Sequence, residues 1–259
     1  LQLKHLSVVC NCAHTASIAM VRIASYNIHC CVGNDGVYDV DRVAGVVERQ
    51  QVDVVCLQEA ESNPDTAKAR SWSEAHADDQ PALIGKKCSL PHSRFLATQS
   101  ASFLRSSTKE GEVLLKEDRA KYGLAILSKF PINKTETLAY ERLTPFKDES
   151  LLFMDKEEQP RGALAVLLEP PGAEPFWVVT THLTHKFASE EQRRQARQLL
   201  TWLDALRAQS TYKKCFLCGD FNSVCFLPRS AYSVITADKR YQDLMWRGSS
   251  LKWFLTQSS

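Results

Sequence analysis

Two polar side chains that could bind a water molecule and a phosphate oxygen follow a short apolar run. The run at 215–218 leads through Gly219 to Asp220, and Asn222 stands two residues further on. In extended backbone, alternate side chains share a face, so Asp220 and Asn222 are expected side by side at a strand's end. A carboxylate accepts hydrogen bonds, whereas a carboxamide both donates and accepts them. The alternative is a plain turn, because Gly, Asp and Asn are common turn residues.

Three other apolar runs also end in polar residues, namely Asn27, Glu59 and His182. Hard divalent cations such as Mg²⁺ prefer oxygen ligands and need only one or two protein carboxylates, which suits Glu59 and Asn27. A carboxylate held against a water molecule can act as a general base, which suits Asp220. Imidazolium or carboxamide donors stabilise charge that develops on a phosphoryl group, which suits His182 and Asn222.

Arg161 stands at the start of another strand-like run. Its guanidinium could bind a phosphate through its fork of N–H donors, and an ion pair at the strand end is the alternative. His29 and His185 are expected to be surface groups or to support the site rather than to act in it.

The segments that must position these residues predict strands and helices packed together. Alternation at 21–28 predicts a strand, and Asp39 can cap a helix that runs to about Gln51. The near-continuous apolar run at 52–57 is typical of a strand covered on both faces. This strand–helix–strand order favours a sheet packed against helices.

Further strands are expected downstream, at 122–129 and in an antiparallel pair formed by 161–168 and 176–183. An edge strand and loops are expected within 133–160. Ser189 and Gln192 have the spacing of a capping box, which predicts a helix to about residue 209. Residues 60–117 have little periodicity and are interpreted as helix fragments or a long surface insertion. The fragments are expected at 65–77 and 110–119.

The composition is that of an ordinary globular protein, with 44% of the 259 residues hydrophobic and 24% charged. This length allows one large α/β domain or two small ones. A formal net charge of +2 does not favour a surface that coats polyanions. The nine cysteines form no disulfide pattern, and Cys215 and Cys218 are expected to be core residues rather than half of a zinc site.

Residues 1–19 are expected to be an N-terminal extension outside the fold. They lack the compact apolar region and cleavage site of a signal peptide. Met20 directly precedes the first convincing strand, which favours it as the natural start of translation. Reduced cysteines and no apolar run of ~18 residues favour a cytoplasmic location, with an organellar or secreted location as the alternatives.

Five motifs follow one another in a fixed order. They are Ser-Tyr-Asn-Ile-His at 25–29, Leu-Gln-Glu at 57–59, Tyr-Gly-Leu-Ala-Ile-Leu-Ser at 122–128, Thr-Thr-His-Leu at 180–183 and Gly-Asp-Phe-Asn at 219–222. In this order and spacing they resemble the endonuclease/exonuclease/phosphatase superfamily, which has the deoxyribonuclease-I-like fold. The resemblance covers about Val21 to Asp243 and is greatest to the broad branch of metal-dependent hydrolases.

The resemblance implies an α/β (α+β) fold, a four-layer α/β/β/α sandwich of two mixed β-sheets flanked by helices. It also implies Mg²⁺-dependent hydrolysis of phosphodiester or phosphomonoester bonds by attack of water, with Mn²⁺ as a substitute. By position, Asn27 and Glu59 would bind the metal and Asp220 would activate the water. Asn222 would align that base and the phosphate, and His182 would contact the scissile phosphate.

The implied substrate is a phosphate ester, with nucleic acid, phospholipid or headgroup, and small phosphates all open. The even charge gives little support to duplex binding, so a lipid or headgroup phosphodiesterase is the alternative to a nuclease. No transmembrane segment and no specific protein partner are expected.

One motif of the family's pattern is missing from the sequence. The pattern ends in Ser-Asp-His, which supplies the His of the central acid/base role, and all seven histidines here precede Asp220. We therefore expect residues 20–245 to form a domain that lacks its last strand or two, followed by an atypical tail at 246–259. A catalytically impaired remnant or a binding module is the alternative to an enzyme, and activity near background is expected.

Overall fold

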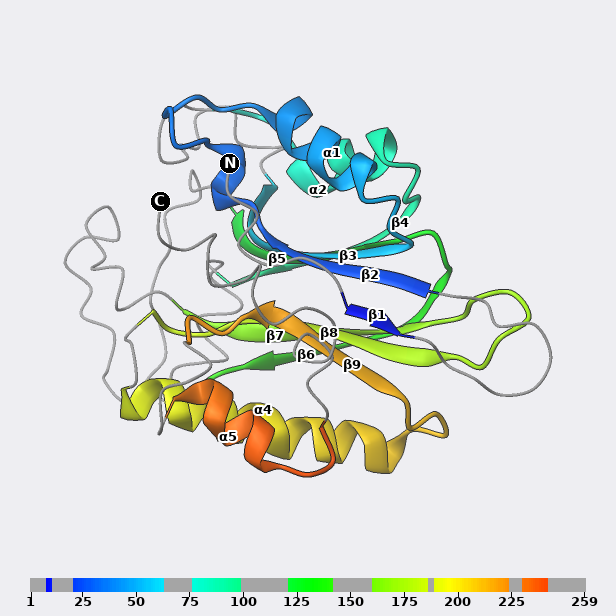
Figure 1. Ribbon diagram of the computed structural model, residues 1–259, viewed down its shortest axis with the longest axis vertical. Coiled ribbons are helices and arrows are strands. Elements are labelled where there is room, and N and C mark those ends of the chain that lie inside the picture. Colours follow the sequence, from blue (N-terminus) through cyan, green and yellow to red (C-terminus); the bar gives the residue numbers. More distant parts are fainter. Residues whose placement is uncertain are drawn as a thin grey trace.

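The computed structural model describes residues 8–10, 21–62, 76–98, 121–141, 160–185, 189–223 and 230–241. Two mixed β-sheets pack face to face, and helices cover the outer face of each (Figure 1). The strand order is β1-β2-β3-β5-β4 in the first sheet and β6-β7-β8-β9 in the second. The four-layer α/β/β/α sandwich that the motifs imply is therefore confirmed.

The first sheet contains one parallel pair of strands that ends at the candidate site. In sheet order its strands are β1 (Val8–Cys10), β2 (Val21–Asn27), β3 (Val54–Ser62), β5 (Lys121–Ser128) and β4 (His92–Ala97). β2 and β3 are parallel, and the other neighbours are antiparallel. The outer face is covered by α1 (Val40–Arg49) and α2 (Gln80–Lys87), and a short 3₁₀ turn, η1 (His29–Cys31), follows β2.

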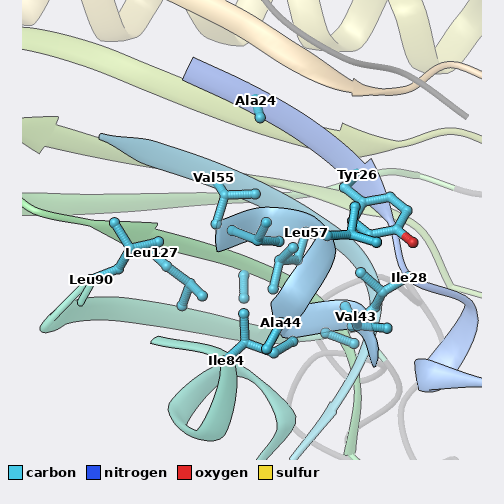
Figure 2. Close-up of a cluster of buried hydrophobic side chains, with 14 of the residues drawn as sticks. Ala24, Tyr26, Ile28, Val43, Ala44, Val55, Leu57, Ile84, Leu90 and Leu127 are labelled. Atoms are coloured by element: carbon cyan, nitrogen blue, oxygen red, sulfur yellow. The ribbon is translucent and has the colours of Figure 1, made fainter. Parts of the chain in front are cut away.

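Helix α1 begins where the sequence predicts, because Asp39 caps it. The Asp39 carboxylate accepts the backbone N–H of Arg42 at 2.9 Å, a bond typical of an N-cap. Apolar residues recur every three or four positions, so one stripe of the helix faces the sheet. Val43 and Ala44 of this stripe are buried in one cluster with Leu57 of β3 (Figure 2). Full burial of a valine or leucine side chain contributes about 1.5–3 kcal/mol.

The second sheet also contains one parallel pair. Its strands are β6 (Ile132–Ala139), β7 (Gly162–Leu168), β8 (Phe176–His182) and β9 (Cys215–Asp220), and its helices are α4 (Glu190–Gln209) and α5 (Ala231–Ala237). β8 and β9 are parallel, and the remaining pairs are antiparallel. The antiparallel pair β7–β8 and the helix that starts after Ser189 are both confirmed.

Side chains from both sheets fill the space between them. Ile126 of β5 and Val178 of β8 are fully buried there. Cys218 belongs to the same cluster, whereas Cys215 packs against the cluster on the helix-covered side of the second sheet. The two free thiols therefore lie on opposite faces of β9 and cannot bind one metal ion. Cys218 is a core residue, as expected, and Cys215 packs against the core.

Two expectations about domain limits need correction. Residues 60–117 are not wholly a surface insertion, since α2 and β4 lie within them and β4 pairs with β5 along its whole length. Pro81 interrupts the sequence pattern but stands in the first turn of α2, where proline is favourable. β4 contains no fully buried residue and so lacks the apolar run that identifies a strand. Residues 1–19 are not wholly outside the fold either, because Val8–Cys10 pairs with β2.

Several expectations fall on residues outside the described ranges. They concern most of the helix fragment at 65–77, the fragment at 110–119, Met20 and the tail at 246–259. Among the helices that the structure describes, none has both the length and the apolar character needed to cross a membrane.

Candidate active site

The carboxyl-terminal ends of the two parallel strand pairs meet at one edge of the sandwich. β2 lies parallel to β3, with Asn27 opposite Gln58, and β8 lies parallel to β9, with His182 opposite Asp220. β2 and β9 are in contact across the two sheets, and both run toward the left side of Figure 1. The polar residues at these strand ends therefore come together, although up to 193 positions separate them in the chain.

Asn27 bridges the two carboxylates of the site. Its Nδ2 donates to Glu59 Oε1 at 2.8 Å and to Asp220 Oδ2 at 2.9 Å. Its Oδ1 accepts the backbone N–H of His29 at 3.0 Å, which determines the orientation of the amide, because a flipped amide would turn a donor toward that N–H. The Glu59 and Asp220 side chains are only 16% and 9% exposed. Three of the predicted site residues thus meet at one partly buried point.

Glu59 reaches this point because β3 is irregular at its position. The pairing register with β5 shifts between Gln58 and Ala60, and Glu59 has a positive φ of 55°. A bulge of this kind re-aims a side chain and is frequent beside active sites. Gln58 is buried and bonded to the second sheet, whereas Ala60 lies in the cluster beneath the helices. Glu59, between them, is turned toward the strand ends, and β3 continues beyond the end that the sequence predicts.

Asp220 ends β9, and a turn rather than extended backbone leads to Asn222. Asn222 has a φ of 46°, and its N–H donates to Asp220 Oδ1 at 2.9 Å, as in an Asx turn. The prediction that these two side chains share one face of an extended strand is therefore wrong. Asn222 instead orients Asp220 through its backbone, and its Nδ2 donates to the carbonyl of Leu183 at 2.9 Å. Gly219 is required beside them, because a Cβ at its φ of 136° would lie 2.2 Å from the Thr181 carbonyl oxygen.

His182 faces the same two carboxylates from the end of β8. Its Nε2 lies 3.8 Å from Glu59 Oε1 and 3.9 Å from Asp220 Oδ2. Its Nδ1 lies 2.7 Å from Nη1 of Arg161. The structure therefore places Arg161 in the site as a partner of His182, and no carboxylate among the described residues forms an ion pair with it.

Tyr122 of β5 packs near the end of β3, opposite Glu61 in the ladder. Burial, followed by the nearby Glu59 carboxylate, raises the pKa of the Tyr122 phenol well above its ordinary value. The phenol is therefore neutral over the physiological pH range and adds no charge to the site.

Gln58 supports the site from below, and the motif comparison does not single it out. It is 1% exposed. Its Nε2 donates to Ser25 Oγ at 3.2 Å and to Thr180 Oγ1 at 2.9 Å. The bond to Thr180 joins the two sheets next to Glu59 in the chain, and the bond to Ser25 lies within the first sheet. The signal in the sequence is a carboxamide at the end of an otherwise apolar run, since a buried polar group needs bonded partners.

Gln192 of α4 is the second support that the sequence patterns miss. Ser189 Oγ accepts the Gln192 N–H at 3.1 Å, as the capping box predicts. The Gln192 side chain does not complete the box. Its Nε2 lies 3.1 Å from the carbonyl oxygen of Thr184, 3.2 Å from that of Phe221 and 2.6 Å from that of Asn222. The first turn of α4 thus holds the loops that follow both β8 and β9.

The oxygen atoms of the site fit a hard divalent cation. The carboxylates of Glu59 and Asp220 both accept hydrogen bonds from Asn27 Nδ2, so the positively polarised N–H groups of this amide lie between them. Asn27 Oδ1 retains a second lone pair beside its bond from His29. Within the described ranges, no group of three or more His, Cys, Asp and Glu side chains could hold a metal ion. Mg²⁺ nevertheless fits, because it is usually bound by one or two carboxylates and completes its shell with water and substrate oxygens.

The fold is a four-layer α/β/β/α sandwich, and an acidic cluster lies where its parallel strands end. Residues 24–247 match the model of the endonuclease/exonuclease/phosphatase family, so the chain belongs to that family. The resemblance that the five motifs carry is thereby confirmed. Members of the family generally depend on a divalent metal ion. No curated protein sequence matches the chain.

Solved structures share the fold. The chain is similar to an endonuclease/exonuclease/phosphatase from Beutenbergia cavernae, with 24% identity and a TM-score of 0.56 over 84% of this chain and 52% of that one. It is similar to ANGEL2, a 2′,3′-cyclic phosphatase, with 19% identity and a TM-score of 0.53 over 83% of this chain and 56% of that one. It is also similar to sphingomyelinase C from Streptomyces griseocarneus, with 19% identity and a TM-score of 0.53 over 83% of this chain and 68% of that one. This chain spans only about half the length of the first two.

Proposed function

We propose that this chain is a Mg²⁺-dependent phosphoesterase that hydrolyses a phosphodiester or phosphomonoester bond by attack of water. The observation that carries the proposal is the contact of one Asn27 nitrogen with both Glu59 and Asp220, beside the ring of His182. Bringing two carboxylates together at a partly buried point costs stability. Such clusters of titratable groups are more typical of catalytic sites than of structural cores.

The roles follow from what each side chain contacts. Glu59 and Asn27 would hold the Mg²⁺, which supplies a Lewis acid that neutralises charge on the phosphate. Asp220 accepts the Asn222 N–H at Oδ1 and faces the shared point with Oδ2, so it can take a proton from a water molecule there. His182 would donate from Nε2 to a phosphate oxygen as negative charge develops on it.

The phosphate group common to all candidate substrates defines the substrate class. Arg161 carries further N–H donors that can bind phosphate oxygens. The net charge of +2 gives little attraction to duplex nucleic acid, which favours a lipid headgroup or a small phosphate. Two of the similar structures are a sphingomyelinase and a 2′,3′-cyclic phosphatase, which supports a phosphate-ester substrate. Mn²⁺ prefers similar oxygen ligands and is expected to replace Mg²⁺.

The test is hydrolysis of bis(p-nitrophenyl) phosphate and p-nitrophenyl phosphate by the chain and by Glu59→Gln, with Mg²⁺, with Mn²⁺ and with EDTA. We expect slow, EDTA-sensitive hydrolysis that Glu59→Gln reduces by about 10- to 100-fold, because the variant keeps the shape of the side chain but loses its charge. Glu169→Gln is the matched control, since among the described residues exposed Asn133 is the hydrogen-bond partner of the Glu169 carboxylate.

Binding of Mn²⁺, followed by electron paramagnetic resonance, gives a second measurement that does not depend on turnover. Glu59→Gln should weaken this binding, and Glu169→Gln should leave it unchanged. If hydrolysis shows no EDTA-sensitive difference between the chain and Glu59→Gln, the chain is not this enzyme.

A further inference from the structure

Arg161 and His182 form a buried pair whose geometry is determined by the sheet. The two residues are 6% and 5% exposed. Gly162, which follows Arg161, is the direct ladder partner of His182 on the neighbouring strand. The guanidinium can therefore reach the ring across one strand spacing, and its Nη1 lies 2.7 Å from His182 Nδ1. This distance is that of a good hydrogen bond.

The donor chemistry of this pair decides which ring nitrogen carries the proton. A guanidinium has five N–H donors and no acceptor, and it stays charged in proteins. His182 Nδ1 must therefore accept, so it carries no proton. The ring is then neutral with its proton on Nε2, the atom that faces Glu59 Oε1 and Asp220 Oδ2 at 3.8 and 3.9 Å.

Nothing else in the described residues explains why Arg161 is held in this place. Its Nε is buried without a hydrogen-bond partner, and no described carboxylate pairs with it. A buried arginine is expected to have an acidic partner. Here the hydrogen-bond partner of the Arg161 guanidinium is instead the His182 ring.

We propose that Arg161 is a positioning residue that holds His182 in the Nε2–H tautomer and so turns its ring into a fixed hydrogen-bond donor at the site. That this donor binds a phosphate oxygen rests on the proposed function. The assignment of the tautomer rests only on the contact with Arg161. In this tautomer Nε2 has no lone pair in the ring plane, so His182 cannot bind a metal ion through it. The ring can therefore donate a hydrogen bond to the substrate, and the cation is bound by oxygen ligands alone.

The test is the ¹⁵N spectrum of the histidine rings in the full chain, labelled on histidine and recorded with EDTA and with saturating Mg²⁺. Long-range ¹H–¹⁵N correlations distinguish the two tautomers, and the loss of one pattern in His182→Gln assigns that pattern to His182. We expect the Nε2–H tautomer under both conditions. Arg161→Lys should keep it, because lysine is also a pure donor, and Arg161→Met should shift the ring to a mixture.

His76 serves as an internal reference, because its Nδ1 accepts the Asp78 N–H at 3.2 Å and its Nε2 lies 2.7 Å from Glu61 Oε2. Its pattern should not change in any variant. Arg94→Met is the matched control, since within the described ranges the exposed Arg94 guanidinium bonds only Thr135 Oγ1 and the Ser93 carbonyl.

An Nδ1–H or doubly protonated His182 in the unmodified chain would overturn the proposal, even if no variant folds. An unchanged tautomer in a folded Arg161→Met would do the same. If hydrolysis is detected, Arg161→Met should lower kcat by about 10- to 100-fold and Arg161→Lys by less. If no hydrolysis is found but the tautomer pattern is as expected, the positioning role stands and the proposed function fails separately.

Discussion

Asn27 supplies the positive polarisation that the two carboxylates of the site need. Glu59 and Asp220 are little exposed, so their mutual repulsion is weakly screened. One amide nitrogen offsets it by donating to both. The residue that the motif comparison assigns to the metal is therefore also the residue that stabilises the acidic pair without one.

Replacing Asn27 by Asp should make the fold dependent on a divalent cation. The substitution removes both donated bonds and adds a third carboxylate at the same point. We expect the free energy of unfolding in EDTA to fall by about 1–3 kcal/mol. Saturating Mg²⁺ should restore much of it, because ligand binding to the folded state alone stabilises that state. Urea unfolding with EDTA and with Mg²⁺ measures both effects.

Asn133→Asp is the control for this prediction, because Asn133 Nδ2 also donates to a carboxylate, that of Glu169, but at an exposed site. Solvent screens the new repulsion there, so the free energy of unfolding should change by no more than about 0.5 kcal/mol. Mg²⁺ should have no effect on it. Equal responses of Asn27→Asp and Asn133→Asp to Mg²⁺ would show that the site does not bind the cation.

Helix α4 is the element that holds the loops after β8 and β9 in one arrangement. Gln195 Oε1 accepts the Thr184 N–H at 2.8 Å, and Gln192 Nε2 lies within hydrogen-bond distance of the carbonyls of Thr184, Phe221 and Asn222. Both glutamines are buried in the first two turns of the helix. The helix therefore packs against the second sheet and also sets the position of the turn that orients Asp220.

Gln192→Met should loosen this turn while leaving the rest of the fold in place. The methionine keeps the volume, but it leaves carbonyl groups of the two loops without their donor, at a cost of about 1–3 kcal/mol. Hydrogen exchange should become faster at Asn222, whose N–H is bound to Asp220 Oδ1. Urea unfolding and exchange followed by mass spectrometry measure these two effects.

Gln198→Met offers a matched control in the same helix. Gln198 Oε1 is buried without a hydrogen-bond partner, so its removal should leave stability unchanged or slightly raised. If Gln192→Met is as stable as Gln198→Met and exchanges at the same rate around residue 222, α4 does not position the site.

At the scale of the whole molecule, the sequence predicts those strands and helices whose apolar pattern or capping residue lies within the element itself. The apolar runs of β5, β7 and β8 and the capped, amphipathic α1 and α4 identify themselves within a few residues. β4 could not be recognised, because a half-buried strand has no apolar run, and Pro81 concealed the start of α2. The register and the sheet order come from long-range pairing, which no local pattern contains.

The residue types of the site could be predicted, but most of their contacts could not. Motif order pointed to Glu59, His182 and Asp220, which the structure brings together. The bulge at Glu59 depends on pairing with β5, and the contact of Arg161 with His182 depends on the β7–β8 register. Neither is encoded in the spacing of a motif.

Partly buried thiols should make the whole molecule sensitive to alkaline pH. Burial raises the pKa of Cys88 to about 11 and the pKa of Cys215 to about 12, from an ordinary 9.0. It also raises the pKa of Tyr26 from 10.0 to about 12. Because the folded values are raised, these groups contribute their stability fully below about pH 9, where both states keep the protons. Above that pH the unfolded chain releases protons first, and the contribution is lost as the pH rises through the folded values.

We therefore expect the free energy of unfolding to decline between about pH 9 and 12, and to decline less in the double variant Cys88→Ala, Cys215→Ala. Urea unfolding with reductant, followed by tryptophan fluorescence at each pH, gives the two slopes. Lysines and exposed tyrosines titrate over the same range in both proteins, so their effects cancel in the comparison. The difference between the slopes then reports the two thiols alone, and equal slopes would mean that folding does not raise the pKa of these thiols.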